Sequence, residues 1–458
     1  MARQFEDQGG MATSDPPAIV RWISSKVVTR MAGAAALEHR RARVERKRRR
    51  AGVPHRVEYF HQIDDGYSHL AAQLLRPLLE RYDVELVLHL VAPERGPNLP
   101  EPELLLALSR YDAAKVAPHY GLRFPGDAAP ADPELSSLGC RILAAAPERE
   151  APEIAVAVGN ALWAADADAM ESLALTHGAA EAGDVSARIA RGNALRTKLG
   201  HYSGATFHYG GEWYWGADRF HHLEKRLTAL GACRSEGEAL VCPRPEIEFG
   251  PLRDDGSLTF EIYPSLRSPY TSLIFDLALR LGEQTGVKTL VRPVLPMVMR
   301  GVPATRQKGR YIFTDAAREA RALGLEWGRF YDPIGDPVRN AYSLYPWAVD
   351  QGKGNALLSQ FLHAAFFEGI NTNRERGLRI VVERAGLSWE VARGLLGNSD
   401  WEDELEENRL AMYEFGSWGV PSFRLLDEQK EPVLALWGQD RLWLFAREIQ
   451  RLLRRRET

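Results

Sequence analysis

The strongest constraint on the fold is an internal repeat that spans most of the chain. Residues 67–122 align with residues 270–325 without a gap, at a constant offset of 203, so that Tyr67 falls on Tyr270. Further matches keep the same order along the chain: Asp112-Ala113-Ala114 with Asp315-Ala316-Ala317, Gly159–Leu162 with Gly354–Leu357, and Trp215–Arg219 with Trp437–Arg441. A repeated unit of about 180 to 200 residues is the size of a whole domain. The repeat therefore predicts two tandem domains of one fold.

Each copy has the same pattern of apolar runs, which predicts the same order of elements. We expect a strand, a helix, a second strand, a long helical stretch, and then a hairpin followed by a last helix. In the second copy these are 258–262, 269–284, 287–291, about 305–415, 422–426 with 433–437, and 441–453. In the first copy the first strand, helix and second strand are expected at 56–60, 67–81 and 84–90. This is an α/β fold whose sheet is interrupted by inserted helices, and its first two strands run parallel. The predicted boundaries are an extension at 1–52, domains at 53–230 and 257–458, and a proline-rich connection at 231–256.

The extension at 1–52 is basic and amphipathic. Its first fifteen or so residues look disordered, after which Ile19, Ile23, Val27 and Met31 recur every fourth residue, as on one face of a helix. Eight basic residues and one acid then occupy positions 40–50. One interpretation is that residues 16–50 contact an anionic membrane surface. The other is a helix that docks on the body of the protein and ends in a solvated basic segment. No aromatic residue interleaves with the basic run, so no nucleic-acid partner is expected.

Composition and cysteine content argue against a membrane-spanning, a secreted or a zinc-binding protein. No apolar run reaches the roughly 18 residues that span a bilayer, and the first residues lack the pattern of a secretory signal. The cysteines are Cys140, Cys233 and Cys242, without a C-x-x-C pair or zinc-binding spacing. A cytoplasmic protein with reduced thiols and no metal is the expectation, although Cys233 and Cys242 are close enough in sequence to pair across a hairpin.

The candidate site lies where the first strand of the second copy leads into its helix. Ser268 and Pro269 are a favoured pair for a helix start, because serine caps the first turn and proline fits its first position. A helix N-terminus presents free N–H groups and the positive end of the helix dipole, which together hold anions. The simpler interpretation is that Ser268 is only a cap.

A second feature is Val420-Pro421, just before the hairpin of the second copy. Proline at a strand start has no N–H to give to the sheet. A cis peptide bond at this position would expose the backbone of Val420 to a ligand. From the residues alone, an ordinary trans proline in a turn is the better expectation.

Taken together, these pieces resemble a known family. The set comprises Ser268-Pro269-Tyr270, Val420-Pro421, Gly438-Gln439-Asp440-Arg441, Lys308-x-x-Tyr311-x-x-x-Asp315-x-x-Arg318 and Phe367-Glu368-Gly369-Ile370. It is similar to the DsbA-like thioredoxin-fold family, on the branch of 2-hydroxychromene-2-carboxylate isomerases and kappa-class glutathione transferases. The resemblance is good over about 258–455 and weak over 55–230. It implies a thioredoxin fold with an inserted all-helical subdomain, here in two tandem copies. Because the repeat spans most of the chain and both copies have the same apolar helix faces, we expect the two copies to pack on each other within the chain.

The resemblance also implies roles for individual residues. Ser268 would face the sulfur of bound glutathione, and Val420, ahead of a cis Pro421, would pair with its cysteinyl unit. Gln439 and Asp440 would hold the γ-glutamyl end, and Lys308 would line the substrate side. The implied activity is a glutathione-dependent isomerase or transferase that acts on a small aromatic molecule. Arg267 departs from the pattern of the family and adds a positive charge beside the site.

The first copy lacks these features. Asp65-Gly66 stands in place of Ser268-Pro269, and Gly204-Ala205-Thr206 stands in place of Val420-Pro421. A carboxylate there would repel a thiolate, so we expect a scaffold that does not bind glutathione. Two alternatives to the glutathione enzyme remain. One is a thiol–disulfide oxidoreductase, which needs a cysteine that neither helix start has; the other is a catalytically silent binding or scaffold protein.

Overall fold

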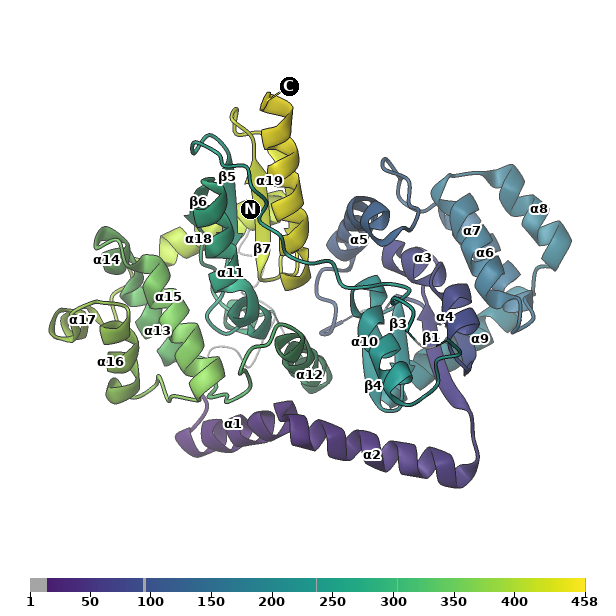
Figure 1. Ribbon diagram of the computed structural model, residues 1–458, viewed down its shortest axis with the longest axis horizontal. Helices are drawn as coiled ribbons and strands as arrows, with labels where there is room; N and C mark the ends of the chain where they lie inside the picture. Colours follow the sequence, from purple (N-terminus) through teal and green to yellow (C-terminus); the bar gives the residue numbers. More distant parts are fainter. Residues whose placement is uncertain (1–14, 94–95, 236, 303, 458) are drawn as a thin grey trace. The chain divides into compact units, whose positions relative to one another are not determined.

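The computed structural model describes residues 15–93, 96–235, 237–302 and 304–457. It divides into an N-terminal unit, Glu38–Pro245, and a C-terminal unit made of Glu246–Thr458 together with the described part of Met1–Leu37. Figure 1 shows the elements of both. The disorder expected near the N-terminus falls on residues 1–14, outside the described residues. Within the described ranges, no helix is long and apolar enough to cross a membrane.

The N-terminal unit is built on a four-stranded sheet in the order β2-β1-β3-β4, in which β1 and β2 are parallel and the other pairs antiparallel. Helices α6 to α8 contact one another beside this sheet (Figure 1). Its elements are β1 His55–His61, α3 Gly66–Ala72, α4 Leu75–Arg81, β2 Val84–Leu90, α5 Pro102–Val116, η1 Ala117–Tyr120, α6 Pro133–Ala145, α7 Ala151–Trp163, α8 Ala167–His177, α9 Ala182–Leu199, β3 Thr206–Tyr209, β4 Glu212–Trp215 and α10 Gly216–Ala229.

The C-terminal unit has the same sheet order and strand directions, β6-β5-β7-β8 with β5 and β6 parallel. Its elements are α1 Ala18–Ala32, β5 Thr259–Tyr263, α11 Pro269–Thr285, β6 Lys288–Val291, η2 Met297–Arg300, α12 Arg306–Ala322, α13 Asp336–Ser343, α14 Tyr345–Asp350, α15 Gly354–His363, η3 Ala364–Glu368, α16 Glu375–Arg384, α17 Trp389–Leu395, α18 Glu402–Glu414, β7 Ser422–Leu426, β8 Pro432–Trp437, η4 Gln439–Arg441 and α19 Leu442–Glu457. Helix α2, Ala34–Ala51, spans the boundary between the units.

Both sheets are covered by their last helix through aromatic side chains. In the C-terminal unit, Phe260 of β5 and Phe423 of β7 contact Phe445 of α19. In the N-terminal unit, Phe207 of β3 contacts Phe220 of α10 in the same way. All of these rings are fully buried, so each unit has a hydrophobic core of its own beneath its sheet.

One predicted helix is broken. The sequence predicts a continuous helix over 67–81, but the structure ends α3 at Ala72 and starts α4 at Leu75. Pro77 explains the break, because it has no N–H to donate and its ring clashes with the carbonyl four residues earlier, that of Gln73. The corresponding helix α11 has no internal proline and runs without interruption to a left-handed C-cap at Gly286.

The extension is not a separate element. Helix α1 confirms the predicted amphipathic helix, but it packs within the C-terminal unit against α12. The second half of the extension belongs to the N-terminal unit, where Arg41 of α2 forms two hydrogen bonds with the carboxylate of Glu212 in β4, at 2.7 and 2.9 Å. The predicted connection at 231–256 is likewise divided between the units, at Pro245. Unit boundaries follow tertiary contacts, which the composition of the sequence did not reveal.

Candidate functional site

Ser268 is the N-cap of α11 and also bonds to the loop that precedes β7. Its side-chain oxygen accepts a hydrogen bond from the N–H of Thr271 at 3.1 Å. Its hydroxyl donates to the carbonyl oxygen of Val420 at 3.2 Å. The structure therefore brings together two predicted site residues that are 152 positions apart, and it has a cis peptide bond between Val420 and Pro421.

The loop before β7 is held rigidly by close packing. A Cβ on Gly419 would lie 2.4 Å from Cε2 of Trp437, so only glycine allows this ring to pack against the loop. The Ser422 hydroxyl donates to the Gly419 carbonyl at 2.8 Å, and the Gly438 N–H donates to the Pro421 carbonyl at 3.0 Å. The N–H of Val420 has no hydrogen-bond acceptor within the described ranges. This leaves one backbone donor available next to Ser268.

A buried tyrosine fixes the turn that leads from β5 to Ser268. The Leu266 N–H donates to the Tyr342 hydroxyl at 3.3 Å, and that hydroxyl donates to the Val294 carbonyl at 3.1 Å. Burial raises the pKa of Tyr342 well above its ordinary value, so its hydroxyl stays protonated and keeps donating. The position of Ser268 is thus set from both sides, by the turn and by its own helix.

Arg267 is paired with a carboxylate. Its guanidinium forms two hydrogen bonds with Asp332, at 2.7 and 2.9 Å. Burial acts to raise the pKa of Asp332, but the Arg267 charge outweighs it and holds that pKa below its usual range. Because the charges offset each other, Arg267 adds less positive potential at Ser268 than the sequence suggests.

The segment that carries Asp332 is in turn held by α1. The guanidinium of Arg21 donates to the carbonyl oxygens of Asp332 and Ile334, at 2.7 and 2.6 Å. The Ser25 hydroxyl oxygen accepts from the Asp332 N–H at 3.0 Å, and the Thr29 hydroxyl bonds both backbone groups of Phe330. The N-terminal helix therefore supports the residue that pairs with Arg267, a link that spans more than 300 positions and has no signal in the sequence.

Lys308 lies in the first turn of α12, which packs against α11. Burial lowers the pKa of Lys308 to about 8, because a charged ammonium is disfavoured away from water. Near neutral pH, this side chain can hold a proton and give it up more readily than an exposed lysine.

Gln439 and Asp440 lie in η4, which also packs against α11. The Nε2 group of Gln439 donates to the buried carboxylate of Glu319 in α12 at 2.8 Å. Its Oε1 atom is buried and has no hydrogen-bond partner among the described residues. The Asp440 carboxylate lies 3.3 Å from the guanidinium of Arg441 and is about one fifth exposed. Glu319, which the sequence reasoning missed, fixes the orientation of the Gln439 amide.

The cysteines are all free and all lie in the N-terminal unit. Burial raises the pKa of the Cys140 thiol to about 12 and raises that of Cys242 further. The structure places none of them at the start of α3 or α11, where a redox thiol would gain from the helix dipole.

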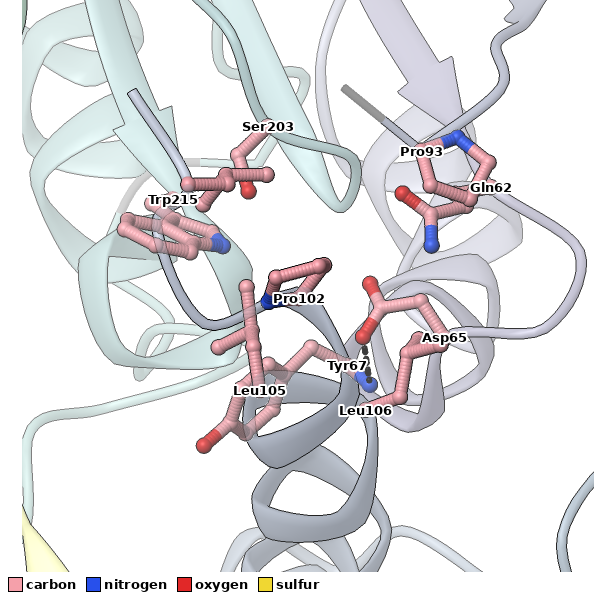
Figure 2. Close-up of a pocket in the computed structure, with 10 residues that line it drawn as sticks. Gln62, Asp65, Tyr67, Pro93, Pro102, Leu105, Leu106, Ser203 and Trp215 are labelled. Atoms are coloured by element: carbon pink, nitrogen blue, oxygen red, sulfur yellow. Dashed lines mark hydrogen bonds between the residues drawn. The ribbon is translucent and has the colours of Figure 1, made fainter. Parts of the chain in front are cut away.

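The N-terminal unit has a small cleft at the place that corresponds to the Ser268 site (Figure 2). Asp65, Tyr67, Ser203 and Trp215 contribute to its lining, together with apolar residues of α5. The Asp65 carboxylate caps α3 by accepting hydrogen bonds from the N–H groups of Tyr67 and Ser68 and from the Ser68 hydroxyl. Burial raises the pKa of Asp65 to about 6, so near neutral pH this cleft holds a negative charge in place of a serine hydroxyl.

The same side-chain hydrogen bond occurs in both units, between residues that are aligned with each other in the repeat. The Tyr67 hydroxyl donates to Asp112 at 2.7 Å, and the Tyr270 hydroxyl donates to Asp315 at 2.8 Å. Both bonds join the helix after the first strand to the first long helix of the insertion. These matched tyrosine–aspartate pairs therefore occupy the same position in the two units, whereas the matched Gly159 and Gly354 do not, since Gly159 lies inside α7 and Gly354 begins α15.

Comparison with known proteins identifies the C-terminal half. Residues 259–450 match the model of the DSBA-like thioredoxin domain family. The chain thus contains a DSBA-like thioredoxin domain in its C-terminal unit. Among curated proteins the sequence has no match.

The solved structures that are similar to this chain include an isomerase and disulfide oxidoreductases. One is a 2-hydroxychromene-2-carboxylate isomerase, 19% identical, with a TM-score of 0.37 over 43% of this chain and 98% of that chain. A probable DsbA oxidoreductase from Streptomyces coelicolor is 20% identical, with a TM-score of 0.33 over 42% of this chain and 90% of that chain. The cytosolic disulfide reductase DsbM from Pseudomonas aeruginosa is 19% identical, with a TM-score of 0.34 over 43% of this chain and 99% of that chain. At these TM-scores, the likeness carries no information about chemistry.

Proposed function

We propose that the C-terminal unit is a glutathione-dependent isomerase or transferase in which Ser268 activates the glutathione thiol. The observation that carries this proposal is the hydrogen bond from the Ser268 hydroxyl to the Val420 carbonyl, beside a Val420 N–H without an acceptor among the described residues. A peptide-like ligand that pairs with Val420 would offer both an N–H and a carbonyl. Its sulfur would then lie next to the hydroxyl at the start of α11.

The Ser268 hydroxyl has one proton, so this proton must change its acceptor when glutathione binds. In the free protein this proton points to the Val420 carbonyl. An N–H from the cysteinyl unit of glutathione can take over that carbonyl, while the ligand carbonyl accepts from the Val420 N–H. The Ser268 hydroxyl is then free to donate to sulfur, and no buried backbone group is left unpaired.

The energy required for activation is within the reach of this arrangement. An unperturbed thiol has a pKa of about 8.5, so only ~3% is ionised at pH 7. Lowering that pKa by about two units needs roughly 2.7 kcal/mol of differential stabilisation. A hydrogen bond to a charged acceptor supplies about 1.5–3 kcal/mol, and the N-terminus of a helix about 0.3–1 kcal/mol. Arg267 is not needed, which agrees with its pairing to Asp332.

The other predicted residues have roles that fit their surroundings. The unpartnered Oε1 of Gln439 and the carboxylate of Asp440 would accept from the α-amino group of the γ-glutamyl end. Lys308, with its lowered pKa, would donate a proton to the substrate or take one from it. The thiolate adds to an electrophilic carbon and the displaced electron pair moves into the substrate. In an isomerase, rotation and expulsion of the thiolate restore that pair; in a transferase, the carbon–sulfur bond remains and the substrate is protonated.

We further propose that the two units arose by duplication and that the N-terminal unit is a scaffold without a glutathione site. Shared strand order, the repeat and the matched Tyr–Asp hydrogen bonds support the common origin. The Asp65 carboxylate at the position of Ser268 supports the loss of thiolate binding. Pairing of the two units within the chain, placement in the kappa-class branch and a cytoplasmic location stay predictions.

The test is to titrate the thiol of bound glutathione through its thiolate absorbance in the wild type and in Ser268→Ala. S-methylglutathione, which has no ionisable thiol, supplies the baseline that removes the protein's own cysteines. We expect the bound thiol to have a pKa near 6.5 in the wild type and about one to two units higher in the variant, which corresponds to the loss of about 1.5–3 kcal/mol.

A matched control separates activation from helix capping. Asp166 caps α8 in the N-terminal unit by accepting from the Ala169 N–H at 2.9 Å, much as Ser268 does for Thr271. Asp166→Ala and Ser268→Ala should each lose about 1 kcal/mol of stability, but only Ser268→Ala should change the titration. An unchanged thiol pKa in Ser268→Ala would remove the role proposed for Ser268. Absence of any glutathione binding to the wild type would favour the silent scaffold.

A further inference from the structure

Helix α1 is docked with its polar face inward. Arg21 is 1% exposed and Ser25 is 2% exposed, and both bond to the backbone of residues 332–334. Arg21, Ser25 and Thr29 are spaced four residues apart and form one stripe along the helix. These hydrogen bonds fix the rotation of α1 about its axis, so its opposite face must point away from the C-terminal unit.

That opposite face is apolar and exposed. Ile19, Val20, Ile23 and Val27 lie on that side of the helix and are 62, 50, 49 and 53% exposed, and Trp22, 49% exposed, lies at its edge, next to Thr29. The other exposed large hydrophobic side chains of the described residues lie singly elsewhere in the chain, from Val44 to Leu410. We call these five residues of α1 the apolar face. A contiguous apolar surface of this kind marks an interaction site, whereas single exposed apolar residues do not.

The charges around the apolar face define the chemistry of its partner. Lys26 and Arg30 lie on the same side of α1, and the helix contains no acidic residue. Their long side chains can reach past buried apolar neighbours to charged groups above them. Apolar side chains including a tryptophan, with lysine and arginine among them and no acids, match the boundary between lipid tails and anionic headgroups.

We propose that the apolar face of α1 is a docking surface for an anionic phospholipid bilayer, with the helix axis parallel to the membrane plane. A convex helix surface with cations among its apolar side chains fits a lipid interface better than the self-complementary patch that a second copy of this chain requires. Arg21 and Ser25 remain bonded to the protein, so attachment does not require α1 to leave the unit. This inference is independent of the proposed glutathione chemistry.

Co-sedimentation of the full chain with vesicles tests the proposal. The vesicles are phosphatidylcholine alone, or phosphatidylcholine with one quarter phosphatidylserine, at 50 and 500 mM salt. We expect binding to the anionic vesicles, weakened but not abolished by high salt, because screening removes the charge attraction and leaves the apolar contact. Ile23→Asp/Val27→Asp should lower the partition coefficient at least tenfold. Since both side chains are half exposed, these changes should leave the fold intact.

Leu175→Asp is the matched control, because Leu175 is 89% exposed on α8 of the N-terminal unit. It should bind vesicles as the wild type does. The proposal fails if the wild type does not bind, if the double variant binds equally well, or if high salt abolishes binding entirely. Self-association that depends on Ile23 and Val27, without vesicle binding, would identify the face as a contact between copies and would also overturn the proposal.

Discussion

Removing the guanidinium of Arg21 should destabilise the C-terminal unit, although Arg21 lies some 225 residues before the main body of that unit. Its side chain is almost completely buried and donates to the carbonyl oxygens of Asp332 and Ile334 and to Asp15. A hydrogen bond from a charged donor contributes about 1.5–3 kcal/mol, and an orphaned buried carbonyl costs about 1–3 kcal/mol. Asp15 is 30% exposed and adds less.

For Arg21→Ala we therefore expect a loss of about 3–5 kcal/mol, the range found when one partner of a buried charged group is removed. In a unit of this size, each kcal/mol lowers the melting temperature by about 2–4 °C. The expected shift is thus roughly 6–20 °C. Arg21→Lys should fall between the wild type and Arg21→Ala, because an ammonium keeps the charge but cannot reproduce the fork of donors that reaches two carbonyls.

Thermal unfolding and hydrogen exchange measure this effect together. Arg30→Ala is the matched control, because Arg30 is exposed on the same helix and its loss should change stability by no more than ~0.5 kcal/mol. Amides of residues 330–336 should lose protection in Arg21→Ala and keep it in Arg30→Ala. Equal melting temperatures for the two variants, with unchanged protection, would refute the view that α1 is an integral part of the C-terminal unit.

Three further predictions concern other parts of the chain. Burial raises the pKa of Asp65 from 3.8 to about 6, so the folded N-terminal unit binds more protons than the unfolded chain in this window, and its stability falls as the pH rises. Asp65→Asn should remove that loss, which comparison of the two unfolding curves from pH 4 to 7 will measure. Gly419→Ala should cost about 1–3 kcal/mol in chemical denaturation because its Cβ meets the Trp437 ring, whereas Gly394→Ala, in open space on α17, should be neutral or stabilising. Insulin reduction with a dithiol donor should stay at the background rate, because no cysteine lies at the start of α3 or α11; a faster rate that is lost on cysteine replacement would contradict this.

The sequence by itself determined the strands and the helices that follow them. Alternating and periodic apolar residues located β2 and β7 to the residue, and β5, β6 and β8 within one position, whereas the inserted helices between 305 and 415 were predicted only as one long helical stretch. Ser268 and Pro269 correctly predicted the start of α11, because helix capping depends on residues that are neighbours in the chain. The break in the helix predicted over 67–81 could also have been predicted from the sequence, because it is caused by Pro77.

Only the tertiary structure decided which groups meet across long stretches of chain. The pattern of α1 showed an apolar face, which would ordinarily turn inward. Instead, three polar side chains match the backbone groups of residues 330–334, and the helix docks the other way round. Charge at Arg267 was visible in the sequence, but its pairing with Asp332 was not. The orientation of Gln439 likewise depends on Glu319, 120 positions away. Periodicity describes one element at a time, whereas hydrogen bonds between elements require their relative positions, which the fold alone provides.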